Sequence, residues 1–422
     1  MRWRPASVVL ALLCACSAAP RAEISSSPLP SASAPATVAI APQPTPVATA
    51  APPAISFEPT PSPTPGALPR CASAVDGVFA LCLKGARVDI DAAIGERDAA
   101  AIAAQISDDL AAVQSEFEWT LRGTPRIDVY ATNERYASGL VEVFGYSRAT
   151  ADFLVENSVA FFEPSLGRIA VSWEAVRARR PIAAVRHELT HFVTLEACAP
   201  RCDLVPAWLN EGEARLAEAL IPGADWRLMR IRNEAASMVS TGTLMPLTAL
   251  WTQSQWNAIG DWAGYYKYQE AARATELMRA DVGERAIARI YARLRAGEDL
   301  ARAYTRLTGR SFDTYLATLS DRLAVGIPSG PAIALSTPGA EGRGTSYLLY
   351  GFPSEAKVTL HLRSSHADET QEISVSPQGA YFATIDDGYP PGTYTITAAS
   401  GSAVAAVTLT KRGGRVVREL RD

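Results

Sequence analysis

The sequence predicts an α+β domain followed by a small all-β domain. Between residues 71 and 327, short apolar segments typical of strands alternate with longer amphipathic segments typical of helices. Beyond Pro328, short alternating segments are separated by Gly, Pro and Asp at intervals of roughly ten residues, which indicates an antiparallel β-sandwich. A chain of 422 residues also exceeds what one hydrophobic core usually organises.

The first domain, residues 71–327, is expected to begin with strands and to end with helices. Alternating apolar patterns predict strands over residues 87–91, 126–130 and 167–173, with a long amphipathic helix over residues 96–119. From Pro181, a residue suited to the first turn of a helix, the pattern becomes helical. We expect helices over residues 181–198, 206–221, 265–281, 284–295, 299–307 and 311–323.

The first 16 residues have the layout of an export signal. Arg2 and Arg4 precede an apolar run and then small residues, and the run is too short to span a bilayer. Its end, Leu13 to Cys16, resembles a bacterial lipobox, which implies lipidation at Cys16; simple cleavage after an Ala-x-Ala-like stretch is the alternative. Residues 17–70 are mostly Pro, Ala, Ser and Thr, a composition typical of a disordered tether.

Four cysteines remain after the expected processing. Disulfides suit an oxidising compartment, and the simplest pairing joins Cys71 to Cys82 and Cys198 to Cys202, although four cysteines permit three pairings. A thiolate zinc site is the competing interpretation, but neither spacing fits a CxxC pair. We therefore expect an extracytoplasmic protein that contacts a membrane only through a lipid at Cys16.

Bulk charge disfavours nucleic acid as a partner. The chain has 40 Lys and Arg against 44 Asp and Glu, a formal net charge of −4. Nucleic-acid-binding proteins usually concentrate positive charge to neutralise phosphates. We expect no nucleic-acid partner.

The segment His187-Glu188-Leu189-Thr190-His191 is an HExxH motif within a predicted helix. Residues four apart share one helix face, so both imidazoles can reach one metal ion while Glu188 points toward a water on that ion. Zn²⁺ is the expected ion, because zinc lowers the pKa of its water toward neutrality and Glu188 can then act as general base.

A catalytic zinc site needs a third protein ligand. Glu211, within "AWLNEGEA", follows His191 after 19 intervening residues, and an antiparallel second helix would return it to the histidines. HExxH followed by this Asn-Glu pair resembles the gluzincin metallopeptidases, especially bacterial peptidase MA-like domains. The resemblance implies a zincin-like fold, zinc ligands at His187, His191 and Glu211, and hydrolysis of peptide bonds in a peptide or protein substrate.

Further site residues follow from the same resemblance. Tyr268 stands where related enzymes carry a tyrosine that stabilises the oxyanion, with Tyr265 and Tyr266 as rivals. Aromatic residues at a helix start often serve packing instead.

The position four after the third ligand is often acidic in related enzymes, where it orients a zinc histidine. Here it is Arg215, so Glu213 or Glu218 is left as the candidate for that contact. The segment over residues 167–173 is a candidate edge strand for binding an extended peptide, although a buried strand shows the same pattern.

The last domain, residues 328–411, resembles the immunoglobulin-like modules of bacterial surface proteins, with "PPGTYTITA" as its most characteristic stretch. Residues 412–422 are expected to form a tail. The partner of this module is not indicated by the sequence. The presence of this module suggests an alternative function: a surface binding or adhesion protein whose zinc site is structural or vestigial. An intact Glu188 favours the enzyme, because a structural site needs no base.

Overall fold

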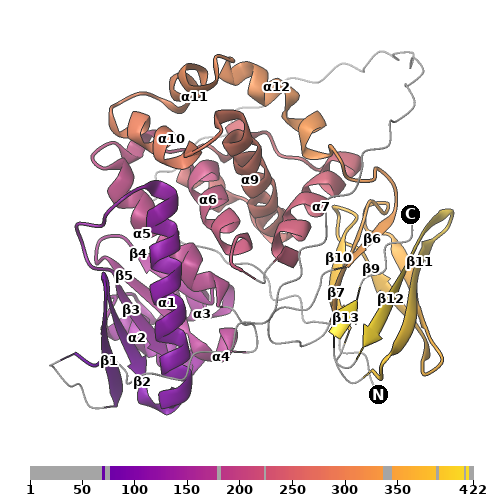
Figure 1. Cartoon of the computed structure of the whole chain (residues 1–422), viewed down its shortest axis with the longest axis horizontal. Helices are drawn as coiled ribbons and strands as arrows, with labels where there is room; N and C mark the ends of the chain where they lie inside the picture. Colours follow the sequence, from indigo (N-terminus) through magenta and orange to yellow (C-terminus); the bar gives the residue numbers. More distant parts are fainter. Residues whose placement is uncertain are drawn as a thin grey trace. The chain divides into compact units, whose positions relative to one another are not determined.

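The computed structural model describes residues 69–71, 77–177, 182–222, 225–335, 345–385, 389–412 and 415–417 (Figure 1). It confirms the coarse fold class, since a mixed α+β region rich in helices is followed by antiparallel sheets. The export segment with Cys16, nearly all of the expected tether, and Pro181 lie outside the described residues. The expected domain boundaries stay predictions.

A five-stranded sheet with the order β1-β2-β3-β5-β4 opens the described chain. β2 pairs in parallel with β3, and β3 with β5, while β1 and β4 are antiparallel edges. The expected edge strand over residues 167–173 is therefore wrong: β5 is interior, because a short segment before it folds back through a tight turn and covers its edge. The strands are β1 (Val78–Leu83), β2 (Ala86–Asp91), β3 (Arg126–Tyr130), β4 (Ala160–Glu163) and β5 (Arg168–Ser172).

Helices cover both faces of this sheet, whose central strands are apolar on one face and carry charged and small residues on the other. Ile127 and Ile169 join a core with α1 (Glu96–Phe117) and α5 (Ala183–Cys198). Ala170 points to the other face and packs with Tyr136. That face is covered by α2 (Asn133–Glu142) and α3 (Arg148–Asn157), and α4 (Trp173–Val176) follows β5; none of these three helices was expected.

The helical part continues from α6 to α12 and matches most of the expected segments within a few residues. α7 and α8 were not expected; Arg and Asn interrupt the apolar pattern of α7, and α8 has only six residues. The bounds are α6 (Ala207–Ala219), α7 (Asp225–Thr241), α8 (Gln253–Ala258), α9 (Asp261–Val282), α10 (Ala286–Arg295), α11 (Leu300–Thr308) and α12 (Phe312–Leu323), with short 3-10 turns η1 (Ala92–Ile94), η2 (Cys202–Leu204) and η3 (Leu247–Leu250).

Helices α6 and α9 pack tightly against each other at Gly212. A Cβ atom placed there would lie 2.6 Å from the backbone oxygen of Ala271 on α9. We expect Gly212→Ala to lower the free energy of unfolding by about 1–3 kcal/mol, since backbone cannot move aside as a side chain can. Thermal unfolding measures this loss, with Gly330→Ala as control because no atom lies within 4 Å of a Cβ there. Equal stability of the two variants would contradict the close approach.

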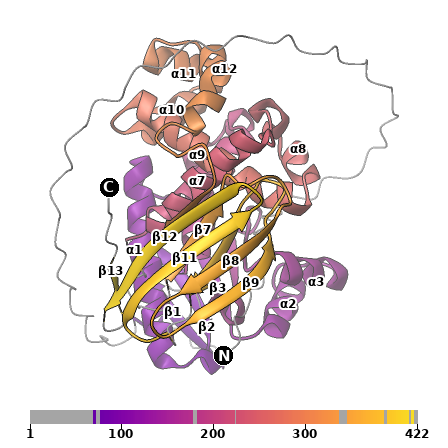
Figure 2. The same cartoon turned by 90° about the vertical axis from the view of Figure 1, so that its right-hand side faces the viewer.

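The C-terminal module, β6 to β13, forms two antiparallel sheets with the orders β10-β7-β6 and β13-β12-β11-β8-β9 (Figure 2). Tyr347, Val358 and Ile396 belong to its own buried core. Strands β7 to β12 confirm the short alternating segments expected beyond Pro328, and β13 lies in the expected tail. The strands are β6 (Ala332–Leu335), β7 (Thr345–Tyr350), β8 (Lys357–Arg363), β9 (Asp368–Ser374), β10 (Tyr381–Ile385), β11 (Gly392–Ser400), β12 (Ala403–Arg412) and β13 (Arg415–Val417).

Two disulfides have the expected pairing. Cys71 is joined to Cys82, and Cys198 to Cys202. Such bonds are typical of proteins outside the cytoplasm. Among the described residues, no helix is both long and apolar enough to cross a bilayer.

Candidate metal centre

Helix α5 presents the HExxH motif to the interior of the protein. No Gly or Pro interrupts the segment, and His187 and His191 lie one helical turn apart, with their ring centroids separated by 4.7 Å. His187 and Glu188 are fully buried, and only 3% of His191 is exposed. The helical placement of the motif is confirmed.

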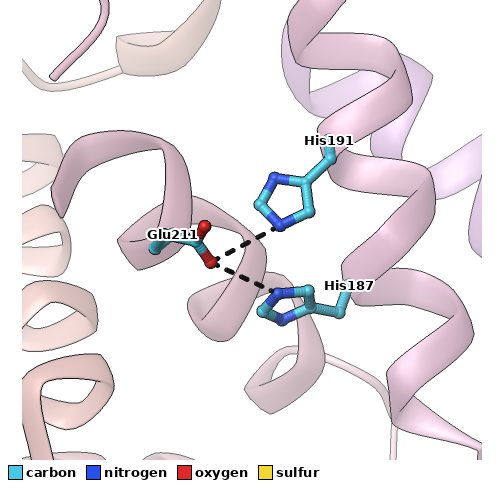
Figure 3. A group of neighbouring side chains, drawn as sticks. All are labelled: His187, His191 and Glu211. Atoms are coloured by element: carbon cyan, nitrogen blue, oxygen red, sulfur yellow. Dashed lines mark ion pairs between the residues drawn. The ribbon is translucent and has the colours of Figure 1, made fainter. Parts of the chain in front are cut away.

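Glu211 reaches the histidines from α6. The chain leaves α5 at Cys198, turns through η2 next to the disulfide with Cys202, and re-enters a helix at Ala207. The Oε2 atom of Glu211 lies 3.6 Å from His187 Nε2 and 3.5 Å from His191 Nε2 (Figure 3). Two ligand atoms of a tetrahedral zinc site lie about 3.3 Å apart. The three side chains thus converge on a volume the size of one metal ion.

Both histidines are oriented by a second contact at Nδ1. His187 Nδ1 lies 2.7 Å from Glu218 Oε1, and His191 Nδ1 lies 3.2 Å from Asn210 Oδ1. An imidazole that donates from Nδ1 keeps the lone pair of Nε2 for a metal, so these contacts select the tautomer that a ligand needs. The contact between Asn210 and His191 was not predicted, although the Asn210-Glu211 pair in the sequence could have indicated it.

The Nε2 atoms of both histidines and both oxygens of Glu211 are buried and make no hydrogen bond within the described protein. Burial opposes charge on these groups, yet contacts with Glu211 and Glu218 raise the pKa of His187 to about 10. Burial would also raise the pKa of Glu211, but the neighbouring imidazoles outweigh this effect and lower that pKa to about 2. The negative carboxylates therefore favour a cation at this place, and the cluster of His187, His191 and Glu211 can hold a metal ion.

No protein-family model matches the chain, and no curated protein sequence matches it significantly.

Of the three candidate tyrosines, Tyr268 lies beside the metal centre. Its ring centroid is 6.3 Å from that of His187 and 4.8 Å from that of Trp256. The Tyr265 hydroxyl instead contacts Gln269 and Glu234, and Tyr266 Oη lies 3.0 Å from Ser376 Oγ in the C-terminal module. Burial raises the pKa of Tyr265 to about 12.

The structure distinguishes the two candidates for the second contact to a histidine. Glu218 contacts His187, whereas Glu213 forms an ion pair with Arg279. Burial raises the pKa of Glu213 to about 7 despite that arginine. Arg215 donates to Glu218 Oε2 at 2.6 Å. It therefore fixes the carboxylate that orients His187.

A cavity of about 370 Å³ opens next to His191. Phe162 and Pro164, at the end of edge strand β4, form one side, and Trp251 contributes to the lining. The disulfide Cys198–Cys202 also lines it. Its remaining lining residues are Thr194, Leu195, Asp203, Val205, Ala207, Asn210, Thr252 and Gln253. The cavity gives a mostly apolar space beside His191, one of the three clustered side chains that can hold a metal ion.

Glu270, on the same helix as Tyr268, makes stability depend on pH. Burial raises its pKa from the usual 4.5 to about 8, although its carboxylate accepts a hydrogen bond from the Met245 N–H at 3.0 Å. The folded state thus binds the proton more tightly than the unfolded state. The protonated carboxyl therefore contributes fully to the free energy of unfolding below pH 4.5. The contribution is lost as the pH rises from 4.5 to about 8, by at most about 1.4 kcal/mol for each pH unit.

We expect Glu270→Gln to gain stability relative to the original protein as the pH rises from 5 to about 8. The glutamine keeps an acceptor for Met245 but does not ionise. Urea unfolding of both proteins across this pH range measures the difference between their free energies of unfolding. The contributions of other titrating groups are the same in both proteins and cancel in this difference. A difference that stays constant with pH would contradict the buried, protonated carboxyl.

Proposed function

We propose that this protein is an exported, zinc-dependent metallopeptidase with a zincin-like catalytic domain and an immunoglobulin-like C-terminal module. One observation carries the proposal: the unpaired Nε2 atoms of His187 and His191 face the carboxylate of Glu211 in a buried site. Among the described residues the cluster has three members, which leaves a position for water or substrate as in catalytic zinc sites. We further propose a lipid anchor at Cys16.

Zinc bound by these ligands would acidify a water and polarise a peptide carbonyl. Glu188 accepts a proton from the attacking water and then delivers it to the leaving nitrogen, which is general acid–base catalysis by one carboxyl group. Tyr268, which packs beside His187, is the candidate donor to the developing oxyanion. Glu218 and Asn210 keep both imidazoles in the tautomer that the site needs.

The surroundings of the site suit a peptide substrate. Among the residues that the structure describes, no strand pairs with the outer side of edge strand β4, so an extended peptide can pair there. Phe162 and Pro164 place the end of this strand at the cavity beside His191. A peptide on β4 would therefore pass the metal centre with one side chain in the cavity.

A peptide-library digestion tests the proposal. Three samples are compared: the protein as purified, the protein treated with chelator, and the chelated protein after zinc is restored. We expect hydrolysis in the first, none in the second, and recovery in the third. Equal product release from all three samples would show that the hydrolysis does not depend on a metal ion and would contradict the proposal.

The cavity predicts a preference for a large apolar side chain next to the scissile bond. We expect Trp251→Ala to lower kcat/KM about tenfold for such peptides while peptides with small residues change little, because the lost contact is specific to the cavity. Trp119→Ala is the control, since Trp119 is partly buried but does not line the cavity. A uniform loss across all peptides would argue against a specificity cavity.

One observation favours a binding or adhesion protein with a structural zinc site instead. The metal-ligating groups are almost completely buried, as they are in structural sites. Structural sites usually have four protein ligands, however, and this cluster has three among the described residues. Tightly held zinc without any chelator-sensitive hydrolysis would favour this second function.

A further inference from the structure

The C-terminal module is packed against α7 and α9, which in turn contact α6, the helix that carries Glu211. Met238 of α7 and Tyr266 of α9 share one buried apolar cluster with Leu348 and Tyr350 of β7. The hydroxyl of Ser237 donates to the backbone oxygen of Gln378, and Tyr266 Oη lies 3.0 Å from Ser376 Oγ. These contacts join β7 and the segment before β10 to α7 and α9.

Close to these contacts, a buried to half-buried polar network surrounds Glu218, the residue that orients His187. We call it the Glu218 network; its members are Arg215, Glu218, Arg227, Arg230, Tyr265 and Gln269. Glu218 Oε2 accepts hydrogen bonds from Arg215 at 2.6 Å and from Arg227 at 3.4 Å.

Arg215 also connects Glu218, through Gln269, to Tyr265 of α9. It donates to Gln269 Oε1 at 3.4 Å, and Gln269 donates to the hydroxyl of Tyr265 at 2.6 Å. Arg230 donates to the same hydroxyl and pairs with Glu234 at 3.0 Å. The network therefore has two ends, at Arg227 and at Arg230.

Phe382 of β10 contacts one end of the network directly and is linked to the other end through Trp226. The guanidinium carbon of Arg230 is 3.9 Å from the centroid of the Phe382 ring. On its other branch, Arg227 lies 4.5 Å over the ring of Trp226, which stacks on Phe382 at 5.5 Å. A single side chain of the C-terminal module thus contacts one arginine directly and the other through Trp226.

We propose that the C-terminal module positions a metal ligand: Phe382 holds Arg230 directly and Arg227 through Trp226, and the Glu218 network carries this restraint to the carboxylate of Glu218 beside His187. The inference rests on the proposed metal site. A guanidinium over an aromatic face is held in one plane by the ring and shielded from water. Without the ring, the side chains of Arg227 and Arg230 become more mobile and more hydrated. The carboxylate of Glu218 is then held less firmly in its orientation.

Zinc binding by the full-length chain tests this role without any need for activity. We compare zinc affinity, by competition with a fluorescent chelator, in the original protein, Glu218→Gln, Phe382→Ala and Phe382→Tyr. Loss of an outer-shell partner weakens metal binding about 10–100-fold, so this is expected for Glu218→Gln, and about fivefold weakening is expected for Phe382→Ala. Phe382→Tyr keeps the ring face and should bind within about twofold of the original protein.

A matched variant separates positioning from loss of stability. Val358→Ala removes a buried side chain from the core of the same module but does not contact the network. It should lower the melting temperature and leave zinc affinity unchanged. If Phe382→Ala does not fold, Phe382→Leu replaces it, because leucine fills the space without a ring face, and it too should bind zinc more weakly.

The outcomes separate this inference from the proposed function. Equal zinc affinity of Phe382→Ala and the original protein would overturn the inference, as would equal weakening in Val358→Ala. Failure of the original protein to bind zinc would overturn the proposed function and the inference together. Normal zinc binding without hydrolysis would overturn the peptidase proposal alone, and the variants would still decide the role of Phe382.

Discussion

Glu188→Gln is expected to abolish peptide hydrolysis while the protein keeps its zinc. A general base contributes about 10²–10⁴ to the rate, and glutamine has the size of glutamate but accepts no proton at neutral pH. Glu188 is not among the three clustered ligands, so the metal should remain bound. Hydrolysis of a peptide substrate and zinc content per chain are measured on the same preparation.

A control on the same helix makes the Glu188 result specific. Glu196→Gln introduces the same chemical change on α5, where Glu196 accepts hydrogen bonds from the backbone N–H groups of Arg122 and Gly123. This variant should retain hydrolysis. Activity in Glu188→Gln that stays within about threefold of the original protein would exclude Glu188 as the base.

Glu211→Gln is expected to remove zinc from the protein. The substitution replaces a charged ligand by a neutral amide in a site with two imidazoles, so zinc affinity should fall by at least about 100-fold. Zinc at 100 times its dissociation constant should stabilise the original protein by about 2.7 kcal/mol and leave this variant almost unchanged. Thermal unfolding with and without zinc measures the difference.

Glu213→Gln is the matched control for Glu211→Gln. Glu213 lies two residues further along α6 and is equally buried, but it pairs with Arg279 rather than with the histidines. Its variant is expected to be less stable but to respond to zinc as the original protein does. A zinc response that persists in Glu211→Gln would show that another group completes the site.

The sequence predicted the helices of the metal centre because local signals and burial agree there. The absence of Gly and Pro between Ile182 and Ala197, and a helix start at Pro206, place α5 and α6 almost as observed. The four-residue spacing of His187 and His191 specifies one helix face, so their juxtaposition follows from helix geometry. Glu211 needed a further assumption, an antiparallel return, which the loop at Cys198–Cys202 provides.

The parts that were missed depend on contacts between distant residues. The edge position of β4 is set by its pairing with β5, and a four-residue segment carries too little pattern to reveal it. Glu218 rather than Glu213 contacts His187 because of how α6 is rotated against α5, which the packing of Gly212 on α9 helps to fix. Phe382 at the Glu218 network follows from tertiary packing alone.

X-ray absorption at the zinc edge tests most directly whether His187, His191 and Glu211 hold one ion. For the zinc-loaded protein we predict two imidazole nitrogens at about 2.0–2.1 Å, oxygen ligands at about 2.0–2.2 Å, and loss of one imidazole from the spectrum in His191→Ala. A shell containing sulfur, or a spectrum that His191→Ala leaves unchanged, would place the metal elsewhere and contradict the account.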